Sequence, residues 1–324
     1  KKAKEGQTLV NINTSFGFKK VVDKVKLVNG SQFRELYSEQ LANQEDAPFD
    51  FTGWNANTDW QDEIFQTVFI TNNNISITGA SPKHSFYLGV GYSYEQGNIE
   101  HEKFSKVTIN ASNDYKITDY LKVGFQFNGA RMLPADSKQV LNALRATPIA
   151  PVYNDEYGLY SALPEFQKAQ INNPMVDVSL RANTTKAENY RASGNIYGEV
   201  DFLKHFNFKA MFSMDYASNN GRTYQPIVKV YDPTVSGNIA TLGTGKTEVS
   251  QFKENETKVQ SDYVLTYTNS FDNGNHNLTA TAGFTTYYNS LSRLDGARKQ
   301  GVGLVIPNDP DKWFVSIGDA ATAT

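Results

Sequence analysis

The stretch KHSFYLGVGYSY, residues 83–94, alternates between two kinds of side chain with a period of two. The even positions are apolar or aromatic and the odd positions include small or polar residues: His84, Phe86, Leu88, Val90, Tyr92 and Tyr94 against Ser85, Gly89, Gly91 and Ser93. Successive side chains of a β-strand point to opposite faces of a sheet. The stretch therefore predicts a long strand with one apolar face and one polar face.

The same alternation recurs along the chain. It covers residues 8–18, 70–79, 105–117, 121–129, 190–202, 206–216, 263–271 and 278–288, which makes about nine strands. Ordinary globular strands have about 5–6 residues, whereas strands that cross a bilayer need about 9–11. Aromatic residues lie near both ends of the apolar faces, as in the girdles of membrane barrels: Tyr92, Tyr94, Tyr115, Phe202, Phe206, Tyr216, Phe271 and Tyr288.

The connections between these strands alternate in length. Short ones cover residues 79–84, 116–122, 202–206 and 271–276, and longer ones cover 20–69, 131–188, 217–250 and 293 onward, with a briefer one at 96–103. In an up-and-down meander, this alternation places all short turns at one end and all long loops at the other. A soluble Greek-key sandwich, the main alternative, gives no reason for such sorting. The sequence predicts an all-β, antiparallel, up-and-down transmembrane β-barrel, present in part, with short periplasmic turns and long extracellular loops that contain short helices.

Composition narrows the functional classes. The 324 residues carry a net charge of −3, which gives no basic field for nucleic acid. No apolar run reaches the ~20 residues of a spanning helix. Cysteine is absent, which suits an oxidising periplasm. The start, KKAKEGQTL, lacks the apolar segment of a signal peptide, so we expect either a cytosolic chain or one whose beginning has been removed.

NTDWQDEIFQT, residues 57–67, is the exception to the alternation and predicts a short helix. Asp59 is placed to cap the first turn, and Trp60, Ile64 and Phe65 follow at helical spacing. The acidic residues Asp59, Asp62 and Glu63 are explained by the dipole at a helix start.

NTDWQDEIFQT followed by NNNISITGASPKHSFYLGVGYSYEQGNI, residues 72–99, resembles the SusC/RagA family of TonB-dependent outer-membrane transporters of the Bacteroidota. The motif positions are Asp59, Trp60, Asp62, Phe65 and Gly79, and Ala80 stands where the family usually has a second glycine. Further similar stretches are KITDYLKVGFQFN (116–128), RATPIAPVYNDEYG (145–158), Asn-Pro at 173–174, FLKHFNFKAMFSMDYA (202–217) and the opening KKAKEGQTLVNINTSFG.

The resemblance implies a fold and a mechanism. Residues 1–324 would form the N-terminal part of the receptor barrel, without the plug domain and the C-terminal half. Import of glycans or oligopeptides through the outer membrane would be driven by TonB, acting through the absent N-terminal region. A SusD-like surface lipoprotein would close over the substrate. Within the loop at 57–67, Trp60 and Phe65 would pack the loop, either against the barrel mouth or into a small core of the loop itself.

The sequence shows no arrangement of catalytic residues, so we expect that the protein is not an enzyme and binds no cofactor. His84, His101, His205 and His276 lie near turns and show no metal-ligand spacing. The oxygen-rich stretches 153–158 and 308–313 do not fit an EF-hand Ca²⁺ loop, and polar turn chemistry explains both.

Exposed aromatic residues in the loops are candidate substrate contacts, because they suit stacking on sugar rings: Trp54, Tyr157, Tyr160, Tyr224 and Tyr231. Two other functions stay open. One is an outer-membrane adhesin or structural barrel without transport, and the other is a soluble carbohydrate-active β-protein, which would need a pair of carboxylates that the sequence does not offer.

Overall fold

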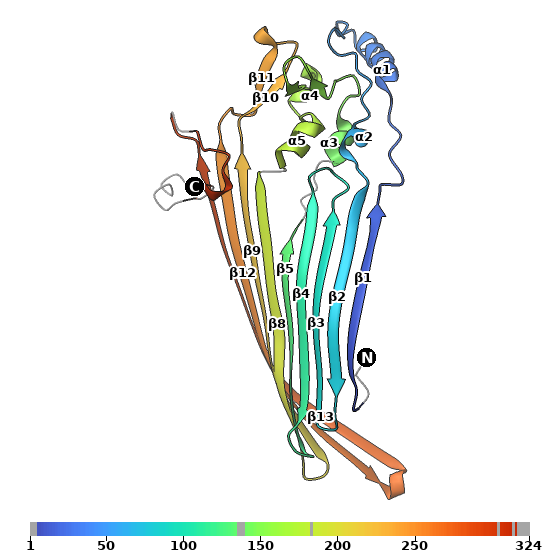
Figure 1. Cartoon of the computed structure of the whole chain (residues 1–324), viewed down its shortest axis with the longest axis vertical. Helices are drawn as coiled ribbons and strands as arrows, with labels where there is room; N and C mark the ends of the chain where they lie inside the picture. The colour runs from blue at the N-terminus through green and yellow to red at the C-terminus, as the bar shows by residue number, and fades with distance from the viewer. Residues whose placement is uncertain (1–4, 135–139, 182–183, 303–304, 313–314, 316–324) are drawn as a thin grey trace.

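Nine long strands form one antiparallel sheet in the computed structural model, which describes residues 5–134, 140–181, 184–302, 305–312 and 315 (Figure 1). The order in the sheet is β1-β2-β3-β4-β5-β8-β9-β12-β13, so each strand pairs with the next long strand along the chain. The bounds are β1 Thr8–Lys19, β2 Val68–Ala80, β3 His84–Gln96, β4 Lys103–Lys116, β5 Leu121–Leu133, β8 Thr185–Phe202, β9 Phe206–Gln225, β12 Glu248–Phe271 and β13 His276–Lys299. The predicted up-and-down meander of nine strands is confirmed.

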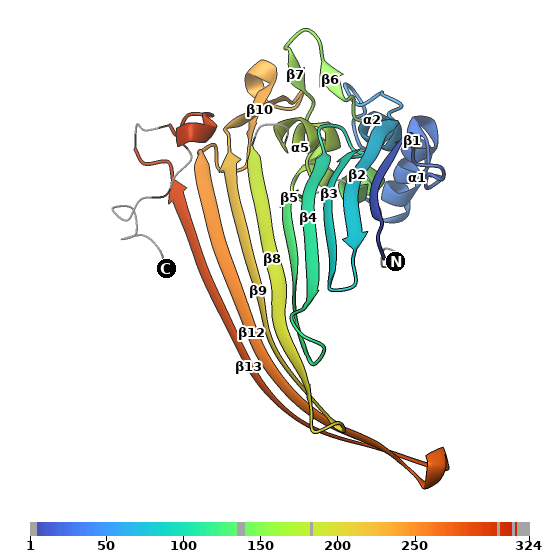
Figure 2. The same ribbon diagram turned by 60° about the horizontal axis from the view of Figure 1, so that its bottom comes forward.

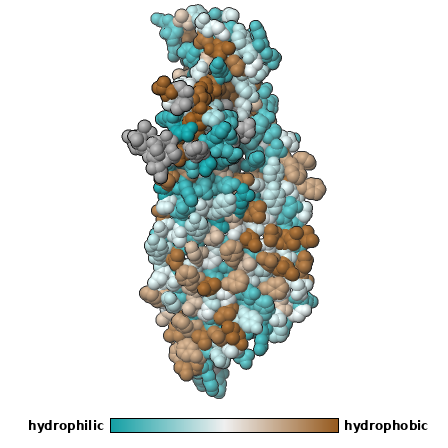
Figure 3. Space-filling model, turned by 60° about the vertical axis from the view of Figure 1, so that its left-hand side comes forward, coloured by the Kyte–Doolittle hydropathy of each residue, from teal (hydrophilic) through white to brown (hydrophobic). Residues whose placement is uncertain are grey.

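The register joins the apolar side chains of neighbouring strands into one face. Ile12 pairs with Ile75, Ile75 with Val90, and Val90 with Ile109. One residue away, the polar Asn13, Asn74 and Thr108, together with Gly91, form a second row on the opposite face. The apolar row is 42–71% exposed, and Figure 3 shows hydrophobic side chains gathered over the lower part of the sheet. We call this the outward face and its opposite the inward face.

The connections are sorted by length, as predicted. The turns β2–β3, β4–β5, β8–β9 and β12–β13 lie at one end of the sheet, and the longer connections lie at the other (Figure 1). The predicted loop bounds were wrong at several strand ends. The largest differences are at β9, which continues to Gln225, and β13, which continues to Lys299, so residues 217–225 and 293–299 are strand and not loop. By a few residues each, β5, β8 and β12 also extend into the predicted loops.

The sheet is curved and open (Figure 2). Among the described strands, β1 and β13 each pair on one side only, and nearly every residue of both is exposed. An edge of this length leaves a row of unpaired backbone N–H and C=O groups. The two edges are therefore places where further strands can add.

The longer connections fold together at the end of the sheet opposite the short turns (Figure 1). We call them the loop layer, which comprises residues 20–67, 97–102, 140–181 and 226–247. It holds the helices α1 Gly30–Asn43, α2 Trp60–Ile64, α3 Val140–Arg145, α4 Glu165–Lys168 and α5 Pro174–Arg181, and two small hairpins, β6 Tyr153–Asn154 with β7 Leu159–Tyr160 and β10 Val228–Tyr231 with β11 Ile239–Leu242. Three 3-10 turns complete the described elements, at Ser236–Asn238, Asp272–Gly274 and Pro310–Lys312.

Helix α1 was not predicted. It begins with a capping box, in which the Asn29 side chain accepts from Gln32 N and the Gln32 side chain accepts from Asn29 N. The spacing of Asn29 and Gln32 is the sequence signal that could have predicted this helix start. Within the described residues, we find no helix that is long and apolar enough to cross a membrane.

Candidate functional site

The main hydrophobic core of the chain lies in the loop layer and not on the sheet. Eleven buried residues from α2, α3, α5 and the segments between them pack together, and we call them the loop core: Trp54, Trp60, Ile64, Ile99, Ala143, Ala146, Ile149, Ala150, Leu163, Met175 and Val178. Residues from three separate connections contribute to it. The loops are therefore folded against one another into a defined platform.

The 57–67 motif anchors this platform. Asp59 caps α2 by accepting from the backbone N–H groups of Gln61 and Asp62, at 3.0 and 3.2 Å. Trp60 is 2% exposed, and its Nε1 donates to the carbonyl of Thr147 at 2.9 Å. The predicted helix and cap are confirmed. Of the two packing sites weighed for Trp60, the structure shows the core of the loops themselves.

The remaining motif residues also have structural surroundings. Asp62 forms an ion pair with Lys24, and Phe65 packs against the loop core and bridges to Ile99. At Gly79, a Cβ would lie 2.5 Å from Cε1 of Phe86, so this position of β2 requires glycine unless the ring moves. These contacts give each motif residue a structural role, and none of these roles requires a ligand.

Aromatic rings join α1 to the platform. Phe33 and Tyr37 of α1 contact Phe166 at centroid distances of 6.1 and 4.6 Å, and Phe49 contacts Phe166 at 5.3 Å. Aromatic pairs at these separations stabilise beyond the area that they bury. The connection between β1 and β2 is thereby attached to the connection between β5 and β8.

The five candidate substrate contacts fall into two groups. Trp54 and Tyr224 are buried, at 2% and 4% exposure, and Tyr224 lies in β9 and not in a loop. Its hydroxyl donates to the carbonyl of Ile306 at 2.8 Å. In this conformation neither side chain can stack on a dissolved solute, because protein atoms already cover both rings.

Tyr157, Tyr160 and Tyr231 lie close together in the loop layer. The rings of Tyr157 and Tyr231 are 5.1 Å apart, and the Tyr157 hydroxyl accepts from Asn238 Nδ2 at 2.9 Å. Next to Tyr160, Ser161 forms a parallel bridge with Tyr231. All three rings are half-buried, so they keep partly accessible surfaces, and their contact with substrate stays a prediction.

A cavity of about 260 Å³ lies between this part of the loop layer and the β10–β11 hairpin, and we call it the loop cavity. Lys168 and Asp232 line it and form an ion pair at 3.2 Å. Burial opposes ionisation of Asp232, but hydrogen bonds from Thr234 and the Lys168 ammonium outweigh it and lower the pKa of Asp232. No local sequence pattern predicts this pair, because its members are 64 residues apart in different loops.

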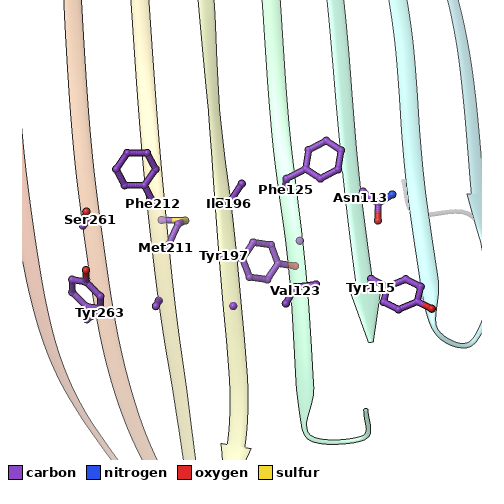
Figure 4. A pocket seen from close by; sticks show the side chains of 13 residues that line it. Asn113, Tyr115, Val123, Phe125, Ile196, Tyr197, Met211, Phe212, Ser261 and Tyr263 are labelled. Atoms are coloured by element: carbon purple, nitrogen blue, oxygen red, sulfur yellow. The ribbon is translucent and has the colours of Figure 1, made fainter. Parts of the chain in front are cut away.

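A second hollow, of about 560 Å³, lies on the outward face over five strands (Figure 4). Its lining includes the small residues Gly198 and Ala210 and the larger side chains of Tyr115, Phe125, Phe212 and Tyr263. A Cβ added at Gly198 would meet no atom within 4 Å. This hollow is a shallow part of the apolar face itself.

Polar turns occupy the two stretches considered for Ca²⁺. Asn154 Oδ1 accepts from Tyr157 N at 3.0 Å, and Asp309 Oδ1 accepts from Asp311 N at 3.1 Å. Over the described part of the chain, no three acidic or histidine side chains gather in a way that could hold a metal ion. Trp313, the last residue of the second stretch, lies outside the described residues.

Comparisons with known proteins point to one group. No family model matches the chain. The TonB-dependent receptor P3 of Formosa agariphila is 28% identical over 300 residues, which cover 88% of this chain and 27% of that receptor. The TonB-dependent receptor SusC of Bacteroides thetaiotaomicron is 30% identical over 162 residues, which cover 48% of this chain and 16% of SusC.

Solved structures agree on the fold. The RagAB peptide importer in its closed-closed state matches with a TM-score of 0.72 at 16% identity, over 92% of this chain and 36% of that one. The same importer in the open-open state gives a TM-score of 0.70 at 16% identity, with the same coverage of both chains. The chain thus spans about a quarter of the length of receptor P3 and about a third of the RagAB chain. The predicted resemblance to SusC/RagA-like TonB-dependent receptors is confirmed, in sequence by the receptors and in fold by RagAB.

Proposed function

We propose that this chain forms part of the wall and extracellular loops of an outer-membrane transporter that imports glycans or oligopeptides. The observation that carries the proposal is the continuous outward apolar face, on strands whose short turns and long loops lie at opposite ends. In water such a face would be a liability for aggregation. In a bilayer it contacts lipid, and the strands between the edges β1 and β13 pair on both sides, as hydrocarbon requires.

The dimensions of the face support this environment. On β3 the outward side chains run from His84 to Tyr94, and at a rise of about 3.3 Å per residue they cover about 33 Å along the strand. With the strand tilt of about 40° that is usual for such barrels, this length corresponds to a band about 25 Å tall, the height of a typical outer-membrane apolar belt. Aromatic rings at Phe86 and Tyr92 lie toward its two edges.

The outward face becomes polar toward the loops. Arg131 forms an ion pair with Glu188, whose carboxylate also accepts from the Tyr190 hydroxyl at 2.7 Å. Farther along the same row, Asn255 accepts from the hydroxyl of Ser218 at 2.9 Å. Charged groups on the lipid side are expensive at the midplane and tolerated at the interface. We therefore place this row at the extracellular surface, with the loop layer in the medium.

The inward face suits a water-filled or plugged lumen. Its side chains form ion pairs across strands, such as the bidentate contact of Arg191 with Asp215 and the contact of Arg293 with Glu254. Such charges need water or a polar partner. In this proposal, a plug and the contact with TonB are supplied by other parts of the transporter, and a SusD-like lipoprotein covers the loop layer. The similarity to TonB-dependent receptors supports these roles.

Uptake in the source organism tests the proposal. We expect the protein in the outer-membrane fraction, together with a co-purifying surface lipoprotein. Deleting its gene should abolish the uptake of at least one fluorescently labelled glycan or peptide. A protonophore should abolish the same uptake in the wild type, because TonB draws on the inner-membrane proton gradient. A protein found in the soluble fraction, or a deletion that leaves uptake of every probe unchanged, would contradict the proposal.

A further inference from the structure

The outward face carries its positive charges at one end only. Toward the short turns it has aromatic rings such as Phe86, Tyr115 and Phe271, and no lysine or arginine on the described strands. On the outward face of those strands, Glu188 is the one acidic residue, whereas several carboxylates point inward. Toward the loops lies a group of basic residues that we call the basic belt: Lys103, Arg131, Lys186, Arg222, Lys253 and Arg298.

Three cations of the belt converge on one place, and we call them the cation triad. Lys186 of β8 lies directly opposite Arg222 of β9 in the register. Arg222 in turn lies opposite Gln251 of β12, so Lys253 is its diagonal neighbour on the same face. Cβ atoms are about 4.5–5.5 Å apart in a directly opposed pair and about 7–8 Å apart on the diagonal. All three side chains are exposed, so a ligand reaches them without any movement of the strands.

The triad is not neutralised within the described part of the chain. None of its three side chains forms an ion pair with a described residue. Glu188, two residues from Lys186, is already paired with Arg131 and accepts from the Tyr190 hydroxyl. Like charges directly opposite one another, such as Lys186 and Arg222, destabilise strand pairing. An anion bound between them would remove this repulsion.

Asp309 is the other carboxylate close to the triad, and it too is engaged. Its Oδ1 accepts from Asp311 N at 3.1 Å, and its Oδ2 pairs with Lys312 at 3.1 Å. The pKa of Asp309 is lowered first by these two contacts, and Lys186 adds only a smaller long-range effect. The positive charge of the triad is therefore left for a ligand from outside the chain.

The height of the triad indicates the size of the headgroup that carries this ligand. On β9, Tyr216 lies at the loop end of the apolar band, and Asn220, the partner of Lys253, and Arg222 follow it. At about 3.3 Å per residue and a strand tilt of about 40°, the triad is about 10–15 Å above Tyr216. The headgroup region of a phospholipid leaflet is only about 5–8 Å thick. An anion at this height belongs to a thicker headgroup, such as a phosphorylated sugar.

Phosphate suits the donors of the triad. Arginine binds phosphate oxygens through two parallel hydrogen bonds, and lysine binds them as a point charge. The triad continues the lipid-facing surface, where neighbouring lipids would keep a soluble acidic polypeptide away. The turn end of the same face has no such cations, so the ligand belongs to one leaflet. We propose that the cation triad binds the phosphate of an anionic glycolipid in the outer leaflet of the membrane.

This inference rests on the proposed function in assuming that the outward face meets lipid and that the loops lie in the medium. Binding is measured by native mass spectrometry on the delipidated protein, expressed from its complete gene and purified in detergent. The probes are diphosphoryl lipid A, the same lipid after its phosphates have been removed, and phosphatidylglycerol. We expect lipid A to bind at least tenfold more tightly than either of the other lipids.

Charge variants locate the binding. Arg222→Gln and Lys253→Gln should each weaken lipid A binding severalfold, and the double variant at least tenfold. Glu188→Gln should strengthen it, because the variant removes the acidic residue of the belt and releases Arg131. Lys258→Gln is the matched control, since it makes the same change on the inward face of β12 and should bind as the wild type does.

Soluble anions test the commitment to a lipid. Inorganic phosphate and polyglutamate should not displace lipid A when the ionic strength is held constant. The inference would be overturned if polyglutamate bound as tightly as lipid A, if removal of the phosphates left lipid binding unchanged, or if Lys258→Gln weakened binding as much as Lys253→Gln does.

Uptake is not part of this measurement, so the two proposals can fail separately. A protein that imports its substrate but does not distinguish lipid A from its dephosphorylated form would refute the lipid site alone. A protein that binds lipid A through the triad but imports nothing would refute the transport proposal alone.

Discussion

The sheet and the loop layer differ in what covers their apolar side chains. On the sheet, large residues such as Ile12 and Phe16 are 71% and 77% exposed, and they have no protein partner layer among the described residues. In the loop layer, Ile64 and Ile149 are fully buried. The sheet therefore depends on a surrounding apolar medium and on further strands at its edges, whereas the loop layer carries its own core. Each region responds to a different kind of substitution.

The largest effect is expected from Trp60→Ala, which empties the centre of the loop core and removes the bond to Thr147. Truncating a buried tryptophan costs about 3–5 kcal/mol. Hydrogen exchange should show faster opening of α2 and α3, with the strands β2 to β5 protected as in the wild type. Equal loss of protection in strands and loops would show that the two regions are not independent.

Ile109→Arg tests the sheet in the same way. The residue lies in the middle of the outward face of β4, where an arginine at the bilayer midplane costs about 2–4 kcal/mol. Its neighbour Asn110 points inward, so Asn110→Arg is the matched control and should cost little. Unfolding by urea in phospholipid vesicles measures both. Similar costs for the two variants would mean that the faces are assigned to the wrong environments.

Asp59→Ala should have a smaller effect, confined to the loop layer. Losing the side-chain cap of a helix costs about 0.5–2 kcal/mol. We expect faster amide exchange at Gln61 and Asp62, whose N–H groups lose their acceptor. Asp59→Asn, which keeps a capping oxygen, should restore most of the protection. If Asn fails to restore it, the carboxylate has another role.

The smallest changes in the free energy of unfolding are expected at two glycines on the outward face of β8, and we expect them to have opposite signs. Gly198→Ala meets open space and should stabilise by about 0.4–1 kcal/mol, because the unfolded chain loses freedom. Gly194→Ala should destabilise, since its Cβ would lie 2.6 Å from the carbonyl oxygen of Gln126. The midpoint of urea unfolding in vesicles shows whether each variant is more or less stable than the wild type. If both midpoints shift in the same direction, the space available for a Cβ does not decide the effect.

The two regions also differ in how far the sequence predicts them. Alternation with a period of two is local, so 83–94 was sufficient to place β3 within a residue or two, and turn lengths gave the topology. Strand ends were less certain, because polar outward residues interrupt the apolar pattern before the strands end, at Ser218 and Asn220 in β9 and at Ser290 and Ser292 in β13. In the loop layer, local helix signals predicted the cap at Asp59 and the helix that contains Trp60. The Lys168–Asp232 pair and the burial of Trp54 depend on packing between distant segments, which no local pattern encodes.

The central claim is that the loop layer faces the medium and the short turns face the periplasm. The chain has no cysteine, so single cysteines can report on each side. Ser236→Cys lies in the β10–β11 hairpin and Asp119→Cys in the exposed β4–β5 turn. Intact cells are treated with a polyethylene-glycol maleimide too large to cross the outer membrane. The account predicts labelling of Ser236→Cys in intact cells and of Asp119→Cys only after the outer membrane is opened. The reverse pattern, or equal labelling of both in intact cells, would contradict it.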